Sequence, residues 1–242
     1  MPVGAIKRFY KTATVTSAQG GFEVRLDNRA LRTPAGRPLT LPTEVLAAAI
    51  AREWGEQPEK GEIRPLEMAM MRLAATAIDR VAVQRQKVID DTAKYAGSDL
   101  LCYRADAPTD LVVRQARVWQ PQLDWAVERY GARLELAAGV QHRPQPETSL
   151  AALAEAIAAH SDFGLSALFN LTAAMGSVVL ALAVSERQLT SSAAFEAAEL
   201  DALYEIEKWG EDSEATQRLE RLRRDVDAGA RFLELLGTAR LL

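Results

Sequence analysis

The stretch TATVTSAQGGFEVRL, residues 12–26, decides the fold class, because it predicts two strands joined by a tight turn. Before the turn, threonines at positions 12, 14 and 16 alternate with small or apolar residues. After Gly20 and Gly21, apolar residues from Phe22 to Leu26 alternate with charged ones, the period that turns one side of a strand inward. The amino-terminal part of the chain is therefore expected to be β-structure.

The residues that follow predict the rest of a small antiparallel sheet and its cover. A turn is expected at residues 34–38, where proline and glycine alternate, with a short strand at 39–41 after it. Thr43 is a natural helix cap, and apolar residues beginning with Val45 recur at helical spacing until Gly55. Three or four strands need a packed face to be stable. This helix is expected to supply it.

Beyond a polar link at residues 57–64, almost the whole chain carries helical periodicity. One apolar stripe starts at Leu66, just after Pro65, and continues to Val81. Further helices are expected at about 88–97, 109–130, 149–160, 163–184, 192–209 and 213–236. The sequence thus predicts an α+β protein: a β-rich amino-terminal subdomain, residues 1–64, and a carboxy-terminal domain, residues 65–242, built as a multihelical orthogonal bundle.

Composition excludes several functional classes. The 242 residues include 33 acidic and 29 basic side chains, for a net charge of −4, which removes the general attraction on which nonspecific nucleic-acid binding depends. Cys102 is the single cysteine and cannot form an intramolecular disulfide, as expected for a reducing compartment. No secretory or transit pattern is evident in the first residues. We expect a cytoplasmic protein that does not bind nucleic acid.

Residues 163–185 are uncharged and long enough for a membrane span. Polar and small residues interrupt the stretch, among them Ser166, Asn170 and Gly176, and no basic cluster on one side would set an orientation. We favour a buried central helix and expect no stable membrane insertion. Membrane association through this stretch stays open as an alternative.

Signals for catalysis or cofactor binding are weak. No glycine-rich loop matches a nucleotide-binding fingerprint. His142 and His160 are too far apart for a typical zinc pair, and Cys102 lies among apolar neighbours with no base identifiable from the sequence. Asp90 and Asp91 would point about 100° apart on a helix. We therefore expect no catalytic residue, no cofactor and no metal.

The segment LYEIEKWGEDSE, residues 203–214, has the most unusual composition in the chain. A structural interpretation explains part of it: Gly210 ends one helix, and the acidic residues favour the start of the next. It does not explain a tryptophan beside a turn within a cluster of carboxylates, which suits docking of a basic, partly apolar surface. A packed corner and a binding feature both remain open. The candidate partner-binding residues are Glu205, Glu207, Trp209, Gly210, Glu211 and Asp212.

Several segments, in order along nearly the whole chain, resemble the Atp12 family of assembly chaperones for the catalytic sector of F-type ATP synthase. They are residues 34–39 (PAGRPL), 51–54 (AREW), 74–79 (AATAID), 99–104 (DLLCYR) and, above all, 205–210 (EIEKWG).

The resemblance implies a non-enzymatic chaperone with an α/β amino-terminal part and a helical carboxy-terminal bundle. It implies binding of the unassembled alpha subunit until the beta subunit displaces the chaperone, and it assigns functional importance to the turn at Glu205, Glu207, Trp209 and Gly210. The lack of an evident transit segment suggests a bacterial cytoplasmic version, and we expect a monomer. The alternative is a small helical enzyme, or a metal- or cation-binding protein, that uses the acidic turn at 205–214.

Overall fold

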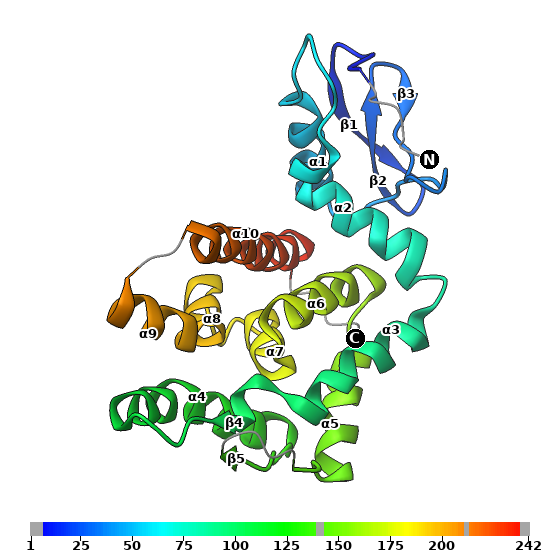
Figure 1. Ribbon diagram of the computed structural model, residues 1–242. Helices are drawn as coiled ribbons and strands as arrows, with labels where there is room; N and C mark the ends of the chain where they lie inside the picture. The colour runs from blue at the N-terminus through cyan, green and yellow to red at the C-terminus, as the bar shows by residue number, and fades with distance from the viewer. Residues whose placement is uncertain (1–6, 139–142, 211–212, 238–242) are drawn as a thin grey trace.

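The computed structural model describes residues 7–138, 143–210 and 213–237. A small antiparallel sheet with one covering helix lies at one end of the molecule, and the remaining helices form a bundle beside it (Figure 1). The protein is therefore α+β, as the sequence predicts.

The sheet has strand order β1 (Ala13–Ala18), β2 (Gly21–Leu26) and β3 (Arg29–Ala30), all antiparallel. A two-residue turn joins β1 to β2, and Gly20 has a φ of 86°, a conformation that favours glycine. The expected strand at 39–41 is reduced to one isolated bridge, in which Phe22 and Leu41 exchange two backbone hydrogen bonds. The prolines at 38 and 42 lack the donors that a longer ladder needs.

Helix α1 (Glu44–Gly55) covers the sheet. The Thr43 hydroxyl accepts a hydrogen bond from the Leu46 amide, so the predicted cap is confirmed. Leu46 and Ile50 are completely buried against the sheet, whereas Val45, expected in the same stripe, is 57% exposed because it lies on the opposite side of the helix.

The core under α1 extends beyond the sheet. It includes α2 (Ala69–Thr76) and reaches Phe232 and Leu235 near the end of α10 (Ser213–Leu236). The Thr43 hydroxyl also donates to the Leu235 carbonyl at 2.6 Å, so residues 192 positions apart in the sequence are joined. This core includes residues from both sides of position 64, and the division into residues 1–64 and 65–242 stays a proposal.

The helix expected from Leu66 begins later than the sequence predicts. Pro65–Glu67 forms a 3-10 turn, α2 starts at Ala69, and Leu66 is 83% exposed. Both carboxylate oxygens of Glu53 accept backbone hydrogen bonds, from Met70 at 2.7 Å and Met71 at 2.8 Å. A carboxylate from α1 therefore satisfies the amides at the start of α2.

The bundle contains shorter helices than expected. Gly176, in a left-handed conformation, ends α6 (Asp162–Met175), and Ser177 caps α7 (Val178–Ser185), so the predicted single helix at 163–184 is wrong. The predicted helix at 192–209 is also divided, at Glu199, whose backbone leaves the helical conformation while Arg218 binds its carboxylate.

The remaining elements are η2 (Ala77–Val81, a π-helix), α3 (Arg85–Ala93), η3 (Lys94–Ser98), η4 (Leu100–Cys102), β4 (Tyr103–Arg104), α4 (Thr109–Tyr130), β5 (Ala137–Ala138), α5 (Glu147–Ala158), α6 (Asp162–Met175), α7 (Val178–Ser185), α8 (Ser191–Ala198) and α9 (Leu200–Trp209).

Helices α6 and α7 form the centre of the bundle. Every residue of α7 from Val178 to Val184 is buried, and Leu165, Leu168 and Leu171 of α6 are completely buried. Among the described residues, no helix combines the length and apolar character that a membrane crossing requires.

Buried Asp99 joins two segments of this bundle. Its carboxylate accepts hydrogen bonds from the Leu101 amide at 3.1 Å and from the Val179 amide at 3.2 Å, at the starts of η4 and α7. Burial raises the pKa of Asp99 to about 6, although these hydrogen bonds act in the opposite direction.

Candidate functional site

The corner between α9 and α10 presents an exposed tryptophan. Trp209 is the last residue of α9, and its side chain is 77% exposed. Gly210 follows with a φ of 91°, and its amide donates to the Ile206 carbonyl at 2.9 Å, which ends the helix. Glycine is thus required here by the backbone. Within the described residues the Trp209 ring is not packed, because most of its surface is exposed, and its role in partner binding stays a prediction.

The carboxylate of Glu207 faces the first turns of α4. Arg114 donates to Glu207 Oε2 through Nη1 at 2.7 Å, although the two residues are 93 positions apart in the sequence. One turn earlier on α4, Asp110 Oδ2 lies 3.0 Å from Lys208 Nζ. Two oppositely oriented ion pairs therefore join the end of α9 to the start of α4.

Tyr204 lies beneath these pairs. Its hydroxyl donates to Asp110 Oδ1 at 2.8 Å, and its side chain is only 4% exposed. The Arg114 guanidinium and the Lys208 ammonium lie 5.4 and 5.2 Å from the ring centroid, within cation–π range. The tyrosine thus contacts three charged residues of the network at once.

The four charged side chains reinforce one another's ionised forms. The hydrogen bond from Arg114 lowers the pKa of Glu207, and that from Lys208, followed by that from Tyr204, lowers the pKa of Asp110. The pKa values of the basic partners are raised in turn: the hydrogen bond to Glu207 raises the pKa of Arg114, and the hydrogen bond to Asp110 raises the pKa of Lys208. Both ion pairs therefore persist at neutral pH.

Four of the six predicted partner-binding residues lie among the described residues, and they divide into three groups. Glu205 and Trp209 are exposed, Glu207 is bound by Arg114, and Gly210 forms the turn. Glu211 and Asp212 lie outside the described residues. The sequence did not predict the roles of Asp110, Arg114, Tyr204 and Lys208 at this corner. Their signal was a pair of matched spacings of four residues, Asp110 to Arg114 on one helix and Tyr204 to Lys208 on the other.

The described residues give little support to a metal site or a nucleophile. They contain no cluster of three histidine, cysteine or acidic side chains arranged to hold a metal ion. Cys102 is buried, and burial raises the pKa of its thiol to about 12. Asp90 and Asp91 have separate partners, a glutamine and two lysines respectively.

The described histidine, His160, has both ring nitrogens occupied. Nδ1 lies 3.0 Å from the Ala156 carbonyl oxygen, and Nε2 lies 2.7 Å from the Ser185 hydroxyl. Burial lowers the pKa of His160. These contacts tie α5 to the end of α7. His142 lies outside the described residues.

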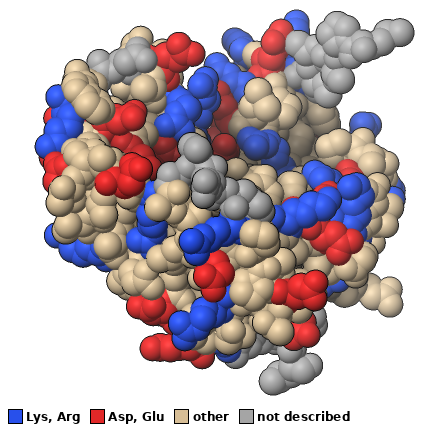
Figure 2. All heavy atoms as spheres, turned by 60° about the horizontal axis from the view of Figure 1, so that its bottom comes forward, with Lys and Arg blue, Asp and Glu red and all other residues tan. Residues whose placement is uncertain are grey.

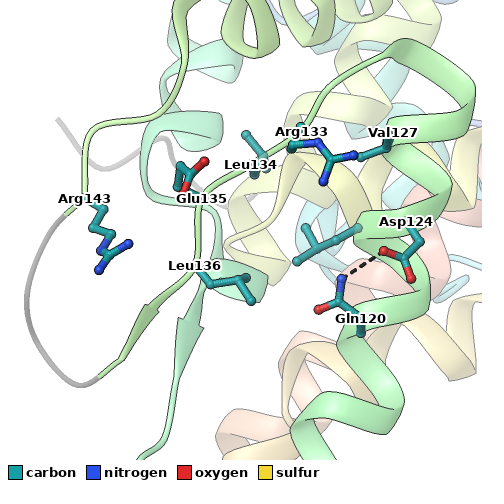
Figure 3. Close-up of a pocket in the computed structure, with 9 residues that line it drawn as sticks. Gln120, Asp124, Val127, Arg133, Leu134, Glu135, Leu136 and Arg143 are labelled. Atoms are coloured by element: carbon teal, nitrogen blue, oxygen red, sulfur yellow. Dashed lines mark hydrogen bonds between the residues drawn. The ribbon is translucent and has the colours of Figure 1, made fainter.

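An open hollow of about 370 Å³ lies between α4 and the segment at residues 133–136 (Figure 3). Its lining mixes apolar side chains with Asp124, Arg133, Glu135 and Arg143. Gln120 donates to Asp124 at 2.9 Å, and the charged side chains come from separate segments without converging on one point. Acidic and basic side chains are likewise interspersed over the face of the molecule in Figure 2. The hollow lacks the convergent groups of a catalytic centre.

Comparisons with known proteins show which family this chain is similar to. The sequence profile of a family described as "ATP12 chaperone protein" matches residues 7–127. The mitochondrial protein atp12 of Schizosaccharomyces pombe is 21% identical over 221 residues, which cover 87% of this chain and 76% of the yeast protein.

Solved structures extend the likeness over nearly the whole chain. Atp12 from Paracoccus denitrificans superimposes with a TM-score of 0.89 at 38% identity, covering 95% of this chain and 98% of that one. The Atu1473 protein of Agrobacterium tumefaciens superimposes with a TM-score of 0.88 at 42% identity, covering 95% and 86% of the two chains.

Proposed function

This chain belongs to the ATP12 chaperone family, and from that premise we propose that it binds the unassembled alpha subunit of the F-type ATP synthase catalytic sector. In this proposal the chaperone shields the alpha subunit's assembly interface until the beta subunit displaces it. The assembly-chaperone role follows from the family, whereas the identity of the client is the proposal. The bacterial relatives of 38% and 42% identity support a bacterial cytoplasmic location.

The observation that carries the binding site is the exposure of Trp209 on a fixed corner. Tryptophan is prominent among residues that dominate binding energy, because it combines a large apolar area with few rotatable bonds. A ring that is 77% exposed leaves most of that area for a partner. The ion pairs between α9 and α4 restrict its helix before binding, which lowers the entropy lost on association.

Displacement by a competing subunit suits this kind of surface. An unassembled subunit exposes an apolar interface that promotes aggregation, and a protein that covers it reversibly stabilises it by mass action. Release then requires only that the beta subunit bind the same surface more tightly. We propose that the protein acts by binding and transforms no substrate.

Aggregation of purified alpha subunit, followed by light scattering with and without the chain, tests this function. We expect suppression at an equimolar ratio by the unaltered protein and by Leu66→Ala, a control at another exposed apolar position. Trp209→Ala should weaken the complex by at least about 30-fold if the ring is a binding hot spot. Undiminished aggregation with the unaltered protein refutes the proposed client, and equal binding by Trp209→Ala refutes the proposed site.

A further inference from the structure

The last turn of α9 has little apolar packing of its own. The buried residues of α9 are Leu200 and Tyr204, and from Glu205 to Trp209 only Ile206 is partly buried against the main core. A helix end with so few buried contacts opens locally at low free energy unless other interactions hold it. Polar contacts must therefore be the main interactions that fix the orientation of Trp209.

Those contacts come from one short stretch of α4. Asp110 binds Lys208 and Tyr204, and Arg114 binds Glu207 at 2.7 Å. Glu207 and Lys208 are the two residues directly before Trp209, so both contacts act next to the tryptophan. Gln115 adds a fourth contact, near the start of α9, donating to Asp201 Oδ1 at 2.8 Å.

The charges of the two pairs alternate across the interface. On α4 the acidic Asp110 precedes the basic Arg114, and on α9 the acidic Glu207 precedes the basic Lys208. Sliding α9 along α4, or rotating it, would separate both pairs and move the Arg114 guanidinium, which belongs to α4, away from the Tyr204 ring. The arrangement thus selects one register of the two helices.

We propose that Asp110 and Arg114 are positioning residues of the chaperone site, which hold the last turn of α9 on α4 so that Trp209 meets the client in one orientation. This inference rests on the proposed function. Glu207 then acts through Arg114 and makes no direct contact with the client. Exposed ion pairs contribute little to global stability, so the effect of breaking them is expected in the local order of α9.

A charge exchange separates positioning from direct contact. The variants are Arg114→Glu, Glu207→Arg and the double exchange of both, which reverses the pair and restores its attraction. Arg129→Glu is the matched control, because it breaks another exposed ion pair, with Glu186 at 2.6 Å, at the far end of the same helix. Urea unfolding of each variant verifies that it is folded.

Two readouts are needed. The first is the affinity for purified alpha subunit. The second needs no client: the protein has four tryptophans, so labelling with 5-fluorotryptophan gives four fluorine resonances, and the one lost in Trp209→Phe reports the surroundings of Trp209. We expect each single reversal to shift this resonance and to weaken the complex about fivefold, within the range for an exposed pair. The double exchange should restore both readouts, and Arg129→Glu should alter neither.

The outcomes distinguish this inference from the proposed function. Weaker client binding in the single variants with an unchanged Trp209 resonance overturns the positioning role. A restored resonance without restored affinity in the double exchange also overturns it, since Glu207 would then contact the client directly. If the Trp209 resonance responds as expected but neither the unaltered protein nor any variant binds alpha subunit, the proposed function is refuted. The contact between α9 and α4 is then still supported by the resonance.

Discussion

Replacing Asp99 with asparagine should remove a pH dependence of stability that this buried carboxylate introduces. Asp99 is completely buried, and burial raises its pKa from 3.8 to about 6. The folded protein therefore binds this proton more tightly than the unfolded chain does. The resulting stabilisation is fully present below about pH 4 and is lost as the pH rises through about 6. A difference of about 2 pKa units corresponds to about 3 kcal/mol.

Urea unfolding of the unaltered protein and of Asp99→Asn at pH 4, 5, 6 and 7.5 measures this effect. Asparagine cannot ionise, so the free energy of unfolding of the variant minus that of the unaltered protein should increase by about 2.5 kcal/mol across this range, since part of the effect is already lost at pH 4. The amide also loses one acceptor for the Leu101 or Val179 amide, which lowers the variant's stability by about 1–3 kcal/mol at every pH.

Asp106→Asn, at an exposed position in the connection between β4 and α4, serves as the control. A constant difference between Asp99→Asn and the unaltered protein would refute the reasoning. A difference that decreases with rising pH would also refute it, because the hydrogen bonds from the two helix starts would then outweigh burial.

Three further predictions concern the framework and the site. A Cβ at Gly229 would lie 2.7 Å from Leu171 Cγ, so Gly229→Ala should lower the free energy of unfolding by about 1–3 kcal/mol, measured by urea unfolding. The control Gly55→Ala, at a position with open space around the added Cβ, should not lower it. Equal effects of the two substitutions would contradict close packing of α10 on α6. Glu53→Ala removes the acceptor for the Met70 and Met71 amides and should destabilise the protein by about 1–2 kcal/mol. The amides at the start of α2 should lose protection from hydrogen exchange, whereas amides elsewhere in the chain keep theirs. Unchanged protection at the start of α2 would contradict the capping role of Glu53. Trp209→Ala should change the free energy of unfolding by less than about 0.5 kcal/mol because its ring is mostly exposed, and a larger loss in thermal unfolding would show that the ring supports the fold.

The sequence predicted the elements whose signals are local. Alternation at residues 12–26 and the cap at Thr43 depend on neighbouring residues only, and both are confirmed. Helix divisions were missed where uniform apolar composition hides them. Residues 163–184 are mostly apolar with no polar face, so periodicity could not show that Gly176 ends one helix and Ser177 begins the next.

Only the α9 side of the candidate site was predicted from the sequence, and the α4 side was not. The composition of residues 203–214 indicated α9 and its turn, but α4 enters through a contact between residues 93 positions apart. Periodicity along a single sequence does not report such pairings. Consequently the ion pair between Glu207 and Arg114 was not predicted.

Sedimentation velocity of alpha subunit and this chain, each carrying a different label, tests the central proposal most directly. Mixed with an equimolar amount of this chain, the alpha subunit should sediment as a discrete complex, and added beta subunit should return the chain to its free sedimentation coefficient. An alpha subunit that sediments alone or as aggregates in the presence of the chain, or a complex that beta subunit leaves intact at saturating concentration, would contradict the account.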